Sequence, residues 1–128
     1  QDEAKKKGLP WSAAKGFDTF TPVSGFIPKE SIPDTDNVRL WLQVDGQTKQ
    51  DGTTKDFIFR IPTLIEHVSA ITKLEEGDLI LTGTPAGVGP VLPGQTITAG
   101  LGLVGSSRDL ISFSFPVVSR PNLRKGNL

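Results

Sequence analysis

The fold of this chain is most constrained by one stretch of alternating side chains that ends in a two-residue turn signal. Between residues 38 and 44, apolar side chains occupy every second position, as on a strand with one buried face. The pair Asp45-Gly46 follows directly and readily adopts the positive φ angles of a tight hairpin turn. We therefore predict an antiparallel hairpin whose second strand returns through residues 47–50.

A second periodic segment predicts one amphipathic helix around residues 61–73. Apolar residues recur there at helical spacing, and Pro62 suits the first turn of a helix. Three apolar runs favour further strands, and they cover residues 78–82, 95–103 and 110–118.

Glycine and proline shape the remainder, since the chain has 14 glycines and 10 prolines among 128 residues. Four prolines between residues 10 and 33 lie too close together for a helix of any length, so we expect extended strands and turns there. The predicted fold class is therefore a β-rich mixed α/β protein.

Charge and cysteine content argue against several classes of function. Fourteen Lys and Arg residues balance fourteen Asp and Glu residues, so no positive surplus attracts nucleic acid or an anionic membrane surface. No apolar run approaches the ~18 residues of a membrane span. The lack of cysteine excludes disulfides, thiol nucleophiles and thiolate metal sites.

The two ends of the sequence suggest a piece of a longer protein. The chain opens at Gln1, contains no Met, and begins with residues typical of the last turns of a helix, with Gly8 just past its end. We expect residues 1–118 to be the carboxyl-terminal portion of a larger domain. Residues 119–128 show no periodicity and predict an irregular tail.

Two places carry candidate chemistry. Lys15 lies in an otherwise uncharged apolar segment, where a lysine either reaches solvent or is held to bind an anion or enolate. The glycine and proline loop at 83–90 is either a tight strand connection or a loop that directs its amides and the hydroxyl of Thr82 or Thr84 at an anionic ligand. The composition leaves these alternatives open.

Four segments together resemble the fumarylacetoacetate hydrolase family. They occur in the family's order over about the first hundred residues, and the strand-to-loop pattern Leu-Thr-Gly-Thr-Pro-x-Gly-Val-Gly is highly specific. The segments are Lys5–Trp11, Lys15–Phe20 followed by Pro22, Leu74–Asp78 and Ile80–Gly89.

This resemblance implies the fumarylacetoacetase C-terminal-like fold, a β-roll of mixed sheets, commonly in a homodimer. It further implies a Mg²⁺ or Mn²⁺ ion that chelates a small dicarboxylate or acylpyruvate substrate and stabilises its enolate as a Lewis acid. Acylpyruvate hydrolysis, oxaloacetate decarboxylation and oxaloacetate keto-enol tautomerisation all pass through such an enolate. Similar family members are mitochondrial, which makes the mitochondrion the expected compartment and the cytoplasm the alternative.

Three positions match the family's site pattern, and all three are hydrogen-bond donors, as a dianionic substrate requires. Lys15 corresponds to the lysine beside the metal that contacts the substrate oxygens. Thr84 corresponds to the hydroxyl that holds the substrate carboxylate, and Gln1 to a helix-borne glutamine that donates its amide to the same ligand.

The family's metal ligands have no counterpart in this sequence. The resemblance places a Glu-x-Glu pair, an Asp and a His-Glu pair before Gln1, and adjacent Glu75 and Glu76 would point to opposite faces of a strand. We therefore expect half a site, belonging to a metal-dependent enzyme. The alternative is a non-catalytic binding or assembly module that keeps the fold without the metal carboxylates.

Overall fold

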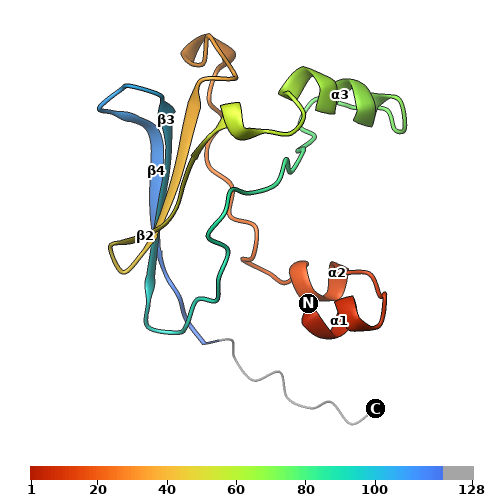
Figure 1. Cartoon of the computed structure of the whole chain (residues 1–128), viewed down its shortest axis with the longest axis vertical. Helices are drawn as coiled ribbons and strands as arrows, with labels where there is room; N and C mark the ends of the chain where they lie inside the picture. The colour runs from red at the N-terminus through yellow and green to blue at the C-terminus, as the bar shows by residue number, and fades with distance from the viewer. Residues whose placement is uncertain (120–128) are drawn as a thin grey trace.

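The computed structural model describes residues 1–119, which form one four-stranded antiparallel sheet with short helices beside it (Figure 1). The strands lie in the order β2-β1-β3-β4. Their bounds are Val38–Val44 for β1, Gln47–Thr53 for β2, Thr96–Leu103 for β3 and Asp109–Pro116 for β4. The helices are α1 (Asp2–Lys6), α2 (Ser12–Lys15) and α3 (Ile61–Ser69), with 3₁₀ turns η1 (Lys29–Ser31) and η2 (Thr54–Asp56). Residues 120–128 of the predicted irregular tail lie outside the described residues.

The hairpin predicted at residues 38–50 is confirmed, and its second strand continues to Thr53. Asp45 and Gly46 make the turn with φ angles of 50° and 76°, as the predicted turn requires. The Asp45 carboxylate also accepts hydrogen bonds from the Thr96 backbone N–H at 2.8 Å and from the Gln95 side chain at 3.0 Å. The turn therefore fixes where β3 begins beside β1.

The indole ring of Trp41 on β1 lies across β3. Its partner in the register is Gly100, and a Cβ atom built on Gly100 would lie 2.7 Å from the Trp41 ring. The indole N–H donates to Asp109 on β4 at 3.0 Å, so one side chain spans three strands. A glycine is needed at position 100 because any side chain would occupy the space of the ring.

The predicted helix at 61–73 is present as α3, but it ends four residues earlier, at Ser69. The N–H groups of Ile71 and Thr72 both donate to the Val68 carbonyl, so the chain tightens into a turn there. The predicted helix end at the start of the chain is also observed. Gly8, with φ of 63°, follows α1, and the N–H of Leu9 returns to the Ala4 carbonyl at 2.9 Å.

Two predictions of strands were wrong. Residues 78–82 pair with no strand among residues 1–119, and Leu79 and Leu81 are 71% and 78% exposed. An apolar run becomes a strand only where a partner satisfies its backbone, and the described part of the chain offers none. Residues 10–33 likewise contain no strand; the space between Pro10 and Pro22 holds the single helical turn of α2.

The sheet also differs from the rolled, mixed sheets that the resemblance implies. Every strand pair within residues 1–119 is antiparallel. The short connections β1–β2 and β3–β4 are hairpins, and a hairpin joins antiparallel strands, whereas a parallel pair needs a long crossover. Residues 1–119 therefore form one antiparallel sheet and not the β-roll of mixed sheets.

The core is small and lies in the centre of the sheet. Among residues 1–119, the buried apolar side chains are Val38, Val44 and Ala99, and no large side chain there is fully buried. Thr54 is also buried, and its hydroxyl accepts a hydrogen bond from the Val38 N–H at 3.0 Å. Many large apolar side chains remain exposed, and nearly all of them lie outside the strands; on the strands, only Leu40 and Leu110 are among the exposed large apolar residues of the described chain. None of the described helices is both long and apolar enough to span a bilayer.

We predict that Gly100→Ala destabilises the sheet, because the added methyl group collides with the Trp41 ring. Overpacking of this kind costs about 1–3 kcal/mol in the free energy of unfolding. Urea unfolding followed by tryptophan fluorescence measures it. Gly25→Ala is the matched control, since nothing lies within 4 Å of a Cβ atom there. Equal stability of the two variants would contradict the assigned role of the Trp41 ring.

Candidate functional site

The loop at 83–90 is fastened to the edge strand β2 through Gln50. The Gln50 carboxamide nitrogen donates to the Thr84 hydroxyl at 2.8 Å, to the Pro85 carbonyl at 2.8 Å and to the Ala86 carbonyl at 3.4 Å. Gln50 is half-buried and pairs with Leu42 on β1. The side chain that orients Thr84 thus comes from the regular part of the sheet.

Two glycines lie on either side of the hydrogen bonds between Gln50 and the loop. A Cβ atom on Gly52 would lie 3.1 Å from the Pro85 ring, and one on Gly87 would collide with the Lys49 carbonyl oxygen. Gly87 also has φ of 100°, which L side chains rarely adopt. The loop therefore approaches β2 as closely as backbone allows, on both sides of Gln50.

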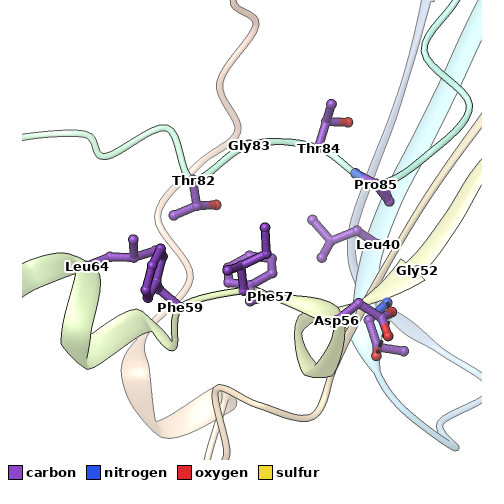
Figure 2. A pocket seen from close by; sticks show the side chains of 12 residues that line it. Leu40, Gly52, Asp56, Phe57, Phe59, Leu64, Thr82, Gly83, Thr84 and Pro85 are labelled. Atoms are coloured by element: carbon purple, nitrogen blue, oxygen red, sulfur yellow. Dashed lines mark hydrogen bonds between the residues drawn. The ribbon is translucent and has the colours of Figure 1, made fainter.

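Thr84 lies where three cavities meet. One of about 370 Å³ is lined by apolar side chains of β1, α3 and residues 57–59, by the end of β2, by Asp56 of η2 and by residues 82–85. Figure 2 shows the Thr82 side chain on the side of the loop that faces Phe57 and Phe59, and the Thr84 side chain on the other side. Asp56, the carboxylate of this cavity, accepts hydrogen bonds from the Thr53 N–H and hydroxyl, so it closes the turn η2.

The other two cavities also include Thr84. One of about 520 Å³ lies along residues 87–91 and includes Lys49 and Gln50 of β2. The other, of about 760 Å³, extends along the apolar face of the sheet to Phe26 and Phe113. Thr84 therefore lies between a surface that includes Lys49 and an apolar surface along the sheet.

Lys15 and Gln1 belong to a separate part of the structure. Lys15 ends α2 and is exposed, with its ammonium 5.9 Å from the centre of the Trp11 ring; Lys5 lies 5.8 Å from the same ring. Lys15 is thus solvent-exposed beside an aromatic ring, in a cation–π contact, and its role in binding an anion or enolate stays a prediction. Gln1 is the exposed residue before α1, and its carbonyl accepts the Lys5 N–H at 2.8 Å.

The structure does not bring the three predicted site residues together. Thr84 lines all three cavities, whereas Gln1 and Lys15 line none of them. In Figure 1, α1 and α2 lie apart from the sheet. Sequence reasoning missed Gln50, which it treated only as the end of the returning strand. Its signal is weak, because a lone glutamine in a predicted strand does not reveal a contact 34 residues away.

No ligand set for a divalent metal ion is present within residues 1–119, where no three acidic, histidine or cysteine side chains gather. The implied Mg²⁺ or Mn²⁺ ion therefore does not fit these residues alone. Glu75 forms an ion pair with Lys73 at 2.7 Å.

An ion pair between Arg39 on β1 and Asp51 on β2 has shifted pKa values. Two hydrogen bonds from the Arg39 guanidinium lower the pKa of Asp51 and raise the pKa of Arg39.

Residues 1–112 match the family model described as fumarylacetoacetate hydrolase, C-terminal. The chain belongs to the fumarylacetoacetate hydrolase family. It is 60% identical over 101 residues to the mitochondrial oxaloacetate decarboxylase of Dictyostelium discoideum, covering 79% of this chain and 46% of that protein. It is 53% identical over 117 residues to the human mitochondrial oxaloacetate tautomerase FAHD1, covering 91% of this chain and 50% of that protein.

Solved structures of this family share the fold. The yeast family member ynq8 superposes with a TM-score of 0.88 at 40% identity, covering 94% of this chain and 52% of that one. The 5-carboxymethyl-2-hydroxymuconate delta-isomerase of Mycobacterium smegmatis gives 0.78 at 36% identity, covering 94% and 44%. The chain thus spans about half the length of the relatives that it matches.

We predict that Gly87→Ala displaces the 83–90 loop from β2, because the new methyl group meets the Lys49 carbonyl and the φ angle is unfavourable. The NMR resonances of the Gln50 carboxamide report the change, since they depend on its hydrogen bonds to Thr84 and Pro85. Gly89→Ala is the control in the same loop, with nothing within 4 Å of its Cβ atom. Unchanged Gln50 resonances in Gly87→Ala would refute the docked loop.

Proposed function

We propose that this chain carries the substrate-binding donors of an enzyme that acts on pyruvate-type β-dicarbonyls. The observation that carries the proposal is Thr84, held by Gln50 in a loop whose sequence matches the family pattern. The relatives are named as oxaloacetate decarboxylase and oxaloacetate tautomerase, both mitochondrial. Oxaloacetate or an acylpyruvate is the class of substrate that this supports, and the mitochondrion is the proposed compartment.

The proposed roles follow from the hydrogen-bonding groups. Thr84 donates its hydroxyl to the substrate carboxylate at the mouth of the loop. Lys15 contributes a positive charge to the substrate oxygens, and Gln1 donates its amide to the same ligand. Charged donors bind carboxylate and enolate oxygens more strongly than neutral donors do, so Lys15 is the residue whose loss should matter most.

The remaining chemistry requires groups outside residues 1–119. A divalent cation, Mg²⁺ or Mn²⁺, would stabilise the enolate as a Lewis acid when bound. Its carboxylate ligands are proposed to come from the part of the relatives that this chain does not span. Hydrolysis, decarboxylation and tautomerisation share the enolate, and the acyl end of the substrate selects among them.

The test is to express the reading frame extended upstream of Gln1 beside the 128 residues of this chain. With Mg²⁺ and oxaloacetate, we expect turnover from the extended protein, and none from the 128 residues because they lack the metal carboxylates. In the extended protein, Lys15→Ala should lower kcat/KM about 100-fold or more, which corresponds to the loss of one charge-assisted contact.

Lys6→Ala is the matched control, because Lys6 is an exposed lysine of the neighbouring helix α1. Near-normal kinetics of Lys15→Ala would refute its role. Mg²⁺-dependent turnover by the 128 residues alone would refute the divided site. An upstream sequence without acidic metal ligands, together with inactivity of the extended protein, would favour the binding or assembly module.

A further inference from the structure

We infer that Gln50 is a positioning residue that sets the direction in which the Thr84 hydroxyl donates. This inference rests on the proposed function, in which Thr84 binds a substrate carboxylate. The Gln50 carboxamide faces one hydroxyl oxygen and two carbonyl oxygens, from Thr84, Pro85 and Ala86. Carbonyl oxygens only accept hydrogen bonds, so the NH₂ group of Gln50 must face the loop.

The orientation of Gln50 has a direct consequence for Thr84. A threonine hydroxyl has one hydrogen and two lone pairs, and the Gln50 N–H at 2.8 Å occupies one lone pair. The hydroxyl hydrogen must therefore point elsewhere, and no acceptor among residues 1–119 takes it. Thr84 is left as a donor on the side of the loop away from Phe57 and Phe59, toward the other two cavities that it lines, which is the polarity that a carboxylate oxygen requires.

The position of Gln50 is itself well defined. It lies on β2 and pairs with Leu42, the last pair before the register shift between Leu42 and Gln43. The close contacts of Gly52 with Pro85 and of Gly87 with Lys49 hold the loop on both sides of it. Gln50 therefore transfers the rigidity of the sheet to a loop that is otherwise exposed.

Two substitutions of Gln50 distinguish orientation of the Thr84 hydroxyl from simple anchoring of the loop. Gln50→Leu removes the donor and should lower kcat/KM of the extended protein for oxaloacetate about tenfold, the effect of one neutral hydrogen bond. Gln50→Glu places a carboxylate against the hydroxyl, which takes the Thr84 hydrogen and repels the Pro85 carbonyl. The loss at pH 7 should be greater than for Gln50→Leu.

The pH profile tests the direction specifically. The carboxyl group of Gln50→Glu becomes a donor once it is protonated, so its kcat/KM relative to wild type should recover as the pH falls toward about 4.3, the ordinary Glu pKa. Gln50→Leu should show no such recovery. The double variant Gln50→Leu with Thr84→Val should have the same kcat/KM as Thr84→Val alone, because Gln50 acts through Thr84.

Gln43→Leu is the matched control, since Gln43 lies on the adjacent strand and its side chain, within residues 1–119, donates to Thr48 at 3.5 Å and does not reach the 83–90 loop. Three outcomes would each overturn the inference. The first is that Gln50→Leu and Gln43→Leu have equal kinetics, and the second is that the losses in kcat/KM are additive in the double variant. The third is that the kcat/KM of Gln50→Glu relative to wild type does not recover at low pH.

A second readout separates this inference from the proposed function. In the 128-residue chain, Gln50→Leu should shift the backbone amide resonances of Thr84, Ala86 and Gly87, and Gln43→Leu should leave them in place. An extended wild-type protein inactive on oxaloacetate would refute the proposed function, while shifted amides would still support the anchoring of Thr84. Unshifted amides would refute the anchoring whatever the activity.

Discussion

The sheet depends on the turn at Asp45, where a single residue closes one pair of strands and aligns another. Its positive φ angle joins β1 to β2, and its carboxylate accepts hydrogen bonds from Gln95 and Thr96 at the start of β3. β1 is the central strand that pairs on both sides. The position of β2, and with it Gln50 and the Thr84 loop, follows from this turn.

The parts predicted correctly are those whose signals are local in sequence. The hairpin at Asp45-Gly46 and the start of α3 at Ile61 follow from residues within a few positions of each other. The strand expected at 78–82 failed because a strand needs a partner as well as an apolar run. Local pattern thus identified the framework but not which segments join it.

The candidate site shows the same division. Thr84 was predicted because its motif is contiguous, and the structure places it on a loop that lines three cavities. Gln50 and the contact between Trp41 and Gly100 join residues distant in sequence, so no periodicity could indicate them. The burial expected as one alternative for Lys15 is absent in the described residues, where its neighbour is the Trp11 ring.

The separation of Lys15 from Thr84 bears on how the proposed site would work. The loop contributes a neutral hydroxyl that is oriented by the sheet, whereas α1 and α2 contribute lysines that gather around Trp11. A dianion needs both kinds of donor, since a single neutral hydrogen bond contributes only about 1 kcal/mol. Under the proposed function, tight binding therefore requires the helical segment and the loop to face one ligand.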